Sequence, residues 1–130
     1  MGKSIKQYLV WSVIGVVVLI AVVLLVNYIE QPNPSVNYDS FVKCLKEKGA
    51  VFYGAFWCPV CKKQKEMFGK SAKSLSYVEC STSDGKGQLQ ACKDRNIRGY
   101  PTWVFKDGSR ELGELKPERL SEKTNCPLPE

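Results

Sequence analysis

Apolar residues follow two patterns along this chain of 130 residues, and the change of pattern divides it into two parts. From Leu9 to Ile29 they form a continuous stretch without a charged residue. A helix of about 20 such residues crosses the hydrocarbon layer of a bilayer. After this stretch, short apolar segments alternate with polar ones, which is the pattern of a folded domain with one core. The sequence therefore predicts a membrane-spanning helix followed by a single folded domain.

The position of the apolar stretch also predicts the topology of the chain. Lys3 and Lys6 precede it, and the first charged residue after it is Glu30. Because basic residues stay on the cytoplasmic side, we expect the N-terminus inside and the domain outside the plasma (inner) membrane, in a single-pass arrangement. The expected segments are a cytoplasmic N-terminus (1–8), a transmembrane anchor (9–29), a linker (30–36) and a folded domain (37–130).

A cleaved signal peptide is the alternative interpretation of the apolar stretch. Its apolar core usually has about 7–15 residues and ends in a cleavage site of small residues. The core here is longer, and the residues that follow it, 27–32, contain no such site. We therefore expect an uncleaved signal-anchor. Pro32 and Pro34 favour an extended linker that holds the domain near the membrane.

The spacing of apolar residues after the linker predicts an alternation of helices and strands. We expect helices over 38–48, 59–69, 86–96 and 117–123, and strands over 50–56, 76–80, 102–106 and 110–113. Leu89 and Cys92 should share the apolar face of the third helix. Asp107-Gly108 is a hairpin signal between the last two strands. This order predicts an α/β domain in which helices flank a small mixed sheet.

The strongest chemical signal is the pair Cys58 and Cys61, separated by proline and valine between the first predicted strand and the following helix. A cysteine at a helix N-terminus is stabilised as a thiolate by unpaired backbone amides and by the helix dipole. We expect Cys58 to be the exposed nucleophile of a thiol–disulfide exchange reaction. Cys61, one turn further along and more buried, would release the mixed disulfide.

A second signal is Tyr100-Pro101-Thr102, directly before a predicted strand. The tertiary amide of an X–Pro bond narrows the preference for the trans form to about 0.5–1 kcal/mol. Taken alone, these residues indicate only a turn before a strand. Together with the cysteine pair, they predict a cis proline that faces Cys58 and helps to bind an extended substrate strand.

Four side chains close to these signals have two interpretations each. Lys62 and Lys63 either assist the thiolate or point into water. Trp57 and Trp103 either belong to the core or form a hydrophobic rim on which a substrate docks. Of the two tryptophans, we include Trp57 among the expected substrate-binding residues.

The number of cysteines, six, together with the absence of histidine, fits an oxidising compartment. A disulfide between Cys80 and Cys92 would stabilise the fold by roughly 3 kcal/mol in the chain-entropy model. We favour this structural role over a second redox pair that relays electrons to or from Cys58. For Cys44 and Cys126 we favour a bridge that clamps the two ends of the domain, over free thiols or an intermolecular link.

Other classes of function lack their signals in this sequence. A zinc site normally needs two close cysteine pairs or histidines, so we expect no metal. We expect no cofactor other than the redox-active disulfide. The net charge of +6 comes from interspersed lysine and glutamate without a basic block, so we expect no binding to nucleic acid.

The residues around both signals resemble the thioredoxin superfamily over about residues 35–126. They are more specifically similar to the thioredoxin-like domain associated with homologues of vitamin K epoxide reductase. The strings that carry this similarity are Phe52-Tyr53-Gly54-Ala55-Phe56-Trp57-Cys58-Pro59, Gln64-Lys65-Glu66-Met67-Phe68-Gly69, Tyr77-Val78-Glu79-Cys80 and Gly99-Tyr100-Pro101-Thr102-Trp103. The resemblance implies a membrane partner that passes electrons from dithiols to a quinone. It also supports a bridge between Cys80 and Cys92, since a further cysteine pair occurs there in that family.

The sequence departs from these relatives at two positions and lacks the multi-helix reductase part. Val60 stands where many relatives carry histidine, which implies a less oxidising couple. Phe52 replaces the buried aspartate of ordinary thioredoxins, which removes the usual internal proton acceptor. The quinone-reducing partner is accordingly expected to be a separate chain.

These observations predict a membrane-anchored, extracytoplasmic thiol–disulfide oxidoreductase that acts on protein dithiols or disulfides. The direction of electron flow stays open. Help in cytochrome or copper-site maturation would use the same chemistry on other clients. The alternative from a different class is an anchored, non-catalytic binding or assembly module in which all cysteines are structural.

Overall fold

A computed structural model describes residues 2–29 and 36–129 of the chain. These residues form two separate units, the helix α1 (Gly2–Ile29) and the folded domain. The expected linker over residues 30–36, with Pro32 and Pro34, lies outside the described residues except for Val36.

Helix α1 begins seven residues before the apolar stretch. Within its segment Ser4–Tyr28, a window of 18 residues has a mean hydropathy of 3.2, and none of that window is buried. At 1.5 Å per residue, its 25 residues are about 38 Å long, which exceeds the roughly 30 Å hydrocarbon layer of a bilayer. By length and composition, α1 is therefore able to span a membrane.

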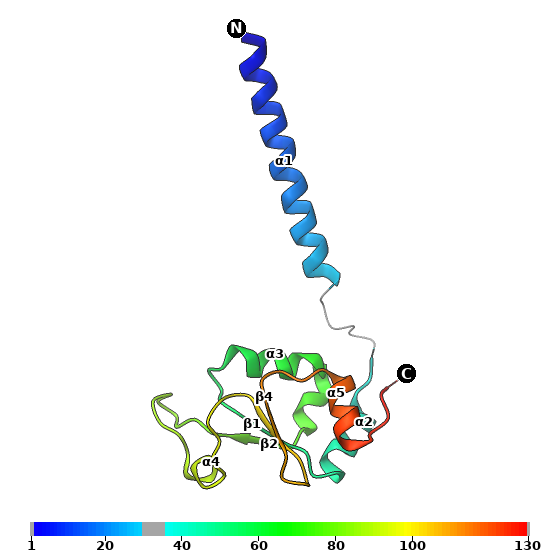
Figure 1. Cartoon of the computed structure of the whole chain (residues 1–130), viewed down its shortest axis with the longest axis vertical. Coiled ribbons are helices and arrows are strands. Elements are labelled where there is room, and N and C mark those ends of the chain that lie inside the picture. Colours follow the sequence, from blue (N-terminus) through cyan, green and yellow to red (C-terminus); the bar gives the residue numbers. More distant parts are fainter. Residues whose placement is uncertain (1, 30–35, 130) are drawn as a thin grey trace. The chain divides into compact units, whose positions relative to one another are not determined.

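The domain is built on a mixed four-stranded sheet with the order β2-β1-β3-β4. Strand β1 pairs in parallel with β2 and antiparallel with β3, which in turn pairs antiparallel with β4. The strands are β1 (Val51–Gly54), β2 (Tyr77–Glu79), β3 (Thr102–Val104) and β4 (Arg110–Leu112). The helices are α2 (Asp39–Glu47), α3 (Pro59–Met67), the 3-10 helix η1 (Gly69–Ser74), α4 (Gln90–Asp94) and α5 (Pro117–Thr124). The α/β class expected from the sequence is confirmed (Figure 1).

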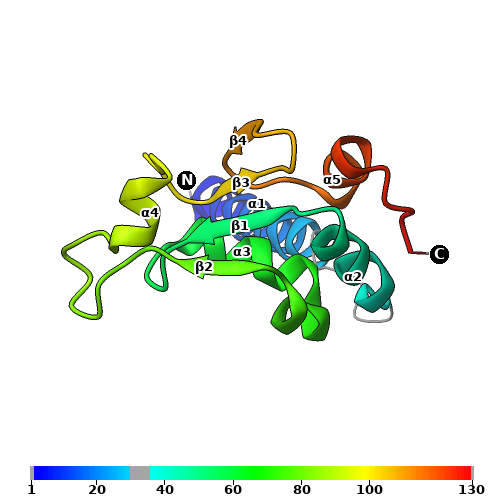
Figure 2. The same ribbon diagram turned by 90° about the horizontal axis from the view of Figure 1, so that it is seen from below.

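Alternating side chains of the central strands divide the core between the two faces of the sheet. On one face, Phe52 stacks on Trp103 at 5.1 Å between ring centroids and packs with buried side chains of α2, α3 and α5. On the other face, Tyr53 packs with the buried Cys80, Cys92 and Ile97. Figure 2 shows α4 at one end of the sheet and α2 and α5 at the other. The larger of the two clusters of buried side chains is the one that includes α3, the helix that begins at the cysteine pair.

The third predicted helix is much shorter than expected, because α4 contains only Gln90–Asp94. The residues before it form a loop of turns and bends, held by a bridge between Ser81 and Gln88 and by a hydrogen bond from the Leu89 amide to the Cys80 carbonyl. The expectation that Leu89 shares a buried face with Cys92 is wrong, since Leu89 is 40% exposed whereas Cys92 is fully buried. The spacing of apolar residues that predicted a helix from residue 86 therefore begins in a loop.

One buried polar side chain connects α3 to the sheet and to the segment before α5. Gln64 is fully buried; its Oε1 accepts hydrogen bonds from Trp103 Nε1 at 3.1 Å and from the Leu115 amide at 2.7 Å. Its Nε2 donates to the Leu115 carbonyl at 2.9 Å. A buried amide with satisfied donors and acceptors fixes one arrangement of its neighbours, because each alternative leaves polar groups unpaired. Gln64 thereby fixes the position of α3.

Two disulfides cross-link different parts of the domain. Cys44 of α2 is bonded to Cys126 behind α5, across 82 residues of sequence. Cys80, at the end of β2, is bonded to Cys92 of α4 across 12 residues. The first disulfide joins the two ends of the domain, and the second ties the loop 81–91 to the sheet.

Replacing the long-range disulfide by alanines (Cys44→Ala/Cys126→Ala) should destabilise the domain more than Cys80→Ala/Cys92→Ala. In the chain-entropy model the losses are about 4 to 5 and about 3 kcal/mol respectively, because the longer loop restricts the unfolded chain more. Urea unfolding of the full chain in detergent, followed by tryptophan fluorescence, measures both. A larger loss for the Cys80–Cys92 variant would show that restriction of the unfolded chain is not the dominant effect.

Candidate functional site

The cysteine pair lies where β1 leaves the sheet and α3 begins. Cys58 is the N-cap residue of α3, with extended backbone (φ −78°, ψ 115°), and Pro59 opens the helix. The Cys61 amide donates a hydrogen bond to Cys58 Sγ at 3.2 Å. Proline suits the first turn because its missing amide hydrogen has no helical partner there. The local sequence therefore places a sulfur where a helix presents unpaired amide donors.

Both sulfurs of the pair are free thiols, unlike the other four cysteines. The Cys61 thiol donates to Cys58 Sγ at a sulfur–sulfur distance of 2.6 Å. Forming a disulfide of about 2.05 Å from this arrangement requires the removal of two electrons and two protons and only a small further approach of the sulfurs. The geometry therefore suits a pair that opens and closes a disulfide without rearrangement of the backbone.

Cys58 is less exposed than the sequence suggested. It is 5% exposed and Cys61 is 1% exposed, so the expectation of an openly accessible Cys58 is wrong, although Cys58 is the more accessible of the two. The reason is that Cys58 also packs within the core cluster beneath α3. A reacting sulfur can therefore reach Cys58 only through a small exposed area.

Cys61 is held in a tight pocket between α3 and the sheet. A side-chain atom added at Gly54 would lie 3.1 Å from Cys61 Sγ and 3.0 Å from the Tyr77 ring, so the close packing depends on glycine in β1. Burial first, and then the hydrogen bond to Cys58, raise the pKa of the Cys61 thiol to about 12. Cys61 consequently keeps its proton at neutral pH while the pair is reduced.

The lysines that follow the pair do not reach the sulfurs. Lys62 and Lys63 are 78% and 69% exposed, and they lie 4.0 Å from Glu66 and 3.7 Å from Glu114. The structure thus favours the second interpretation of these side chains. Lys65 instead places its ammonium 3.4 Å from the centre of the Tyr77 ring, beside Cys61, where its charge lowers the Cys61 pKa slightly.

The Tyr100-Pro101-Thr102 segment lies beside the cysteine loop. The Tyr100–Pro101 bond is cis, and the Tyr100 ring packs edge-on against Trp57 at 6.0 Å. The Pro101 side chain is fully buried, and Thr102 Oγ1 donates to the Gly99 carbonyl at 2.8 Å. The Tyr100 hydroxyl accepts a hydrogen bond from Gln88 Nε2 at 2.8 Å. Residues far apart in sequence are therefore brought together at one end of the sheet.

An apolar rim surrounds the cysteine pair, and we define it as Phe56, Trp57 and Val60. These side chains are 60%, 52% and 40% exposed although they are large and apolar. Trp103, the other rim candidate, is 1% exposed and stacks in the core, so the rim interpretation of Trp103 is wrong. Trp103 sits in a central strand, whereas Trp57 sits in the loop before α3 with its indole NH donated to Ser81.

Glu79, a residue that the sequence reasoning did not single out, supports the cysteine loop from the end of β2. Its carboxylate accepts hydrogen bonds from the Phe56 amide at 3.2 Å, the Ser81 amide at 2.9 Å and the Tyr77 hydroxyl at 2.6 Å. Burial alone would raise the pKa of Glu79, but these hydrogen bonds outweigh it and hold the pKa below its usual range. A lone glutamate at a strand end has no local signal that would identify this role.

Two comparisons relate the chain to known proteins. The family model named Thioredoxin matches residues 31–124. The chain is also 33% identical, over 154 aligned positions, to thiol-disulfide oxidoreductase LTO1 of Arabidopsis thaliana. The aligned region covers 97% of this chain and 41% of that protein, so the chain spans about two fifths of the length of this curated relative. With so little of the chain left outside, the aligned region includes the apolar stretch as well as the domain.

The Cys58→Ser variant should keep the Cys61 thiol unreactive toward iodoacetamide at neutral pH. Burial, the larger cause of the raised Cys61 pKa, remains in this variant, and only the thiolate is alkylated readily. Labelling of Cys61, followed by mass spectrometry, should rise only well above pH 9. The matched Cys61→Ser variant reports on Cys58 alone. Rapid labelling of Cys61 near pH 8 would contradict the buried setting.

Replacing Glu79 with glutamine should cost about 1–2 kcal/mol at pH 7, because a charged acceptor of three hydrogen bonds is lost. The folded-state pKa of Glu79 is lowered, so its stabilising effect is present above the unfolded value near 4.5 and is lost as the pH falls through the folded value. The stability gap between wild type and Glu79→Gln should therefore shrink towards pH 3. Urea unfolding at both pH values measures the gap, and Glu66→Gln, at an exposed position of α3, is the control. An equal gap at both pH values would argue against a charged Glu79.

Proposed function

Because this chain belongs to the thioredoxin family, we propose that it is a thiol–disulfide oxidoreductase acting on protein substrates through Cys58 and Cys61. The observation that carries the proposal is the position of Cys58 Sγ. This sulfur caps α3 and accepts a hydrogen bond from the Cys61 amide. It also lies 2.6 Å from the sulfur of Cys61, the only other free cysteine among the described residues. The similarity to a thiol-disulfide oxidoreductase over nearly the whole chain supports the same activity.

The exchange reaction follows from the different settings of the two cysteines. The Cys58 thiolate attacks one sulfur of a substrate disulfide, forms a mixed disulfide and releases the other substrate sulfur as a thiolate, which takes up a proton. Cys61 then loses its proton and attacks Cys58 Sγ. This closes the Cys58–Cys61 disulfide and releases the second substrate thiol. Two electrons pass from the protein to the substrate, and the reverse sequence oxidises a substrate dithiol.

The substrate-binding residues in this proposal are Trp57, Tyr100, Pro101 and Thr102; Trp57 and Tyr100 form the accessible surface, and the buried Pro101 and Thr102 fix the backbone behind it. The contact between the Trp57 and Tyr100 rings supports a continuous surface beside Cys58. The exposed apolar side chains Phe56 and Val60 extend it. Such a surface favours an unfolded or extended substrate segment, which offers apolar side chains and unpaired backbone groups.

We place this activity outside the cytoplasm, on a membrane anchor formed by α1. The lysines before the apolar stretch favour a cytoplasmic N-terminus and an exported domain. The disulfides Cys44–Cys126 and Cys80–Cys92 support this location, since structural disulfides persist in oxidising compartments. Their cysteines are buried or half-buried, which favours a structural function for them.

For the electron partner we propose a quinone-reducing membrane enzyme of the vitamin K epoxide reductase type. The sequence strings around the cysteine pair and the proline segment support this choice. Coupled to such a partner, the chain would oxidise client proteins and return its electrons to the membrane. Its redox potential distinguishes the two directions, since a value near about −120 mV is typical of an oxidant and one near about −270 mV of a reductant.

A non-catalytic binding module would need Cys58 and Cys61 to be locked in a structural bridge. They are free thiols, whereas the other four cysteines are paired. This difference favours the exchange activity over the module.

In the Cys61→Ala variant, Cys58 should accumulate in mixed disulfides with clients and with the membrane partner. The resolving thiol is missing, so the first step of exchange occurs and the second does not. Non-reducing gels of membranes that carry the full chain, followed by mass spectrometry, identify the adducts. The Cys58→Ala/Cys61→Ala variant is the control and should form none. An absence of adducts from Cys61→Ala would overturn the proposed exchange.

A further inference from the structure

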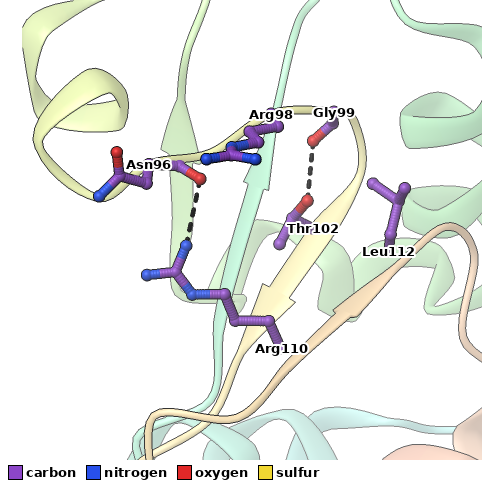
Figure 3. A pocket seen from close by; sticks show the side chains of 6 residues that line it. All are labelled: Asn96, Arg98, Gly99, Thr102, Arg110 and Leu112. Atoms are coloured by element: carbon purple, nitrogen blue, oxygen red, sulfur yellow. Dashed lines mark hydrogen bonds between the residues drawn. The ribbon is translucent and has the colours of Figure 1, made fainter.

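A pocket lies beside the proline segment, on the side where the edge strand β4 meets the loop before β3. It has a volume of ≈ 590 Å³ and is open to solvent. Its lining is formed by Asn96, Arg98, Gly99, Thr102, Arg110 and Leu112 (Figure 3). Of these residues, only Gly99 and Thr102 belong to the site described above, and we call this cavity the arginine pocket.

The arginine pocket carries positive charge without a neutralising partner. Arg98 and Arg110 are exposed and form no ion pair with any residue that the structure describes. Arg110 donates one hydrogen bond, from Nη1 to the Asn96 carbonyl at 3.2 Å, and this bond orients its guanidinium group. In Figure 3 both guanidinium groups lie toward Asn96, and Leu112 lies toward the other end of the pocket. Several N–H donors of the two arginines are therefore left for a ligand.

The alternation of side chains along β4 explains why no acidic residue enters the pocket. Arg110 and Leu112 share one face of the strand, and Glu111 between them faces the other way. On that side Glu111 accepts hydrogen bonds from Arg119 at 2.6 and 3.0 Å and lies 3.8 Å from Lys123. The one carboxylate of the strand is thus bound elsewhere, and the pocket presents two cations next to a leucine that is 70% exposed.

The arginine pocket adjoins the proposed substrate surface through the backbone. Gly99 and Thr102 line the pocket, and the two residues between them, Tyr100 and Pro101, belong to the substrate segment. The hydrogen bond from Thr102 Oγ1 to the Gly99 carbonyl fixes the backbone turn between these two residues. Arg110 and Leu112 lie on the sheet face opposite Trp103, so the path from Cys58 to the pocket runs over Tyr100, and we take an extended peptide, at roughly 3.3 Å per residue, to follow it.

We propose that the arginine pocket is a specificity subsite for an acidic residue of the client polypeptide, Glu or Asp, a few positions from the reacting cysteine. The proposal rests on the proposed exchange activity and deepens it by naming the substrate class. Guanidinium groups bind carboxylates through paired, charge-assisted hydrogen bonds. The exposed Leu112 adds an apolar contact for a neighbouring side chain of the same client.

The test uses the full chain in phosphatidylcholine nanodiscs and a set of short peptides that contain one disulfide. A single Glu is moved through successive positions from the reactive cysteine, and each peptide has a twin with Gln at that position. The rate constant for reduction of each peptide by the reduced protein is measured under identical salt conditions. The net charge of +6 attracts every acidic peptide to some extent, so the readout is the dependence on position.

We expect the Glu peptide to react about tenfold faster than its Gln twin at one or two adjacent positions, and about equally fast elsewhere. Arg98→Gln/Arg110→Gln should abolish that advantage and leave the Gln peptides unchanged. The control Lys70→Gln/Lys73→Gln removes the same charge from the exposed 3-10 helix η1 and should keep it. Arg98→Glu/Arg110→Glu should shift the preference at the same positions to peptides with lysine.

An advantage for Glu that is equal at all positions, or that survives in Arg98→Gln/Arg110→Gln, overturns the subsite. Equal rates for all twins in neutral nanodiscs also overturn it, as expected if the arginines bind anionic lipid headgroups instead. Reduction of the protein by dithiothreitol separates the two proposals. If Cys58 and Cys61 exchange with dithiothreitol while no position effect exists, only the subsite fails. If they do not exchange at all, both proposals fail.

Discussion

The hydrogen bond from the Cys61 amide to the Cys58 sulfur is the contact on which the site depends. It makes a cysteine, rather than a serine or aspartate, the cap of α3, so the start of the helix and the position of the reactive sulfur are fixed by one interaction. The same turn places Cys61 one step deeper, against Gly54 of β1. The difference between the two thiols therefore follows from their places on a single helical turn.

Two polar side chains hold this turn in place from outside the cysteine pair. Gln64 anchors the middle of α3 to the core, and Glu79 binds the backbone just before Cys58. Both satisfy several backbone or ring donors at once, and the cost of leaving such donors unpaired makes them strong constraints. The helix and the loop before it are consequently fixed independently, and the sulfur between them has little freedom to move.

The surface near the cysteine pair has an apolar region and a cationic region. The apolar rim of Phe56, Trp57 and Val60 surrounds the sulfurs, and the arginine pocket lies beyond the proline segment. Glu111, Arg119 and Lys123, by contrast, are joined in a cluster of ion pairs. Unpaired cations and exposed aromatic rings in one region are the features that a binding surface needs and a merely solvated surface does not.

The sequence by itself determined the elements that depend on local patterns. These include the apolar helix, the alternation of strand and helix around the cysteine pair, the hairpin at Asp107-Gly108 and the place of Cys58 at a helix start, because propensity, spacing and turn chemistry act over a few residues. Local patterns failed at α4, where hydrogen bonds from Leu89 and Gln88 to distant residues replaced a helix with a loop. Only the tertiary structure decided the burial of Cys58 and Trp103, the bond between Cys44 and Cys126, the role of Glu79 and the meeting of Arg98 with Arg110. Each of these depends on packing between segments far apart in the chain, and a side chain's local sequence carries no record of such neighbours.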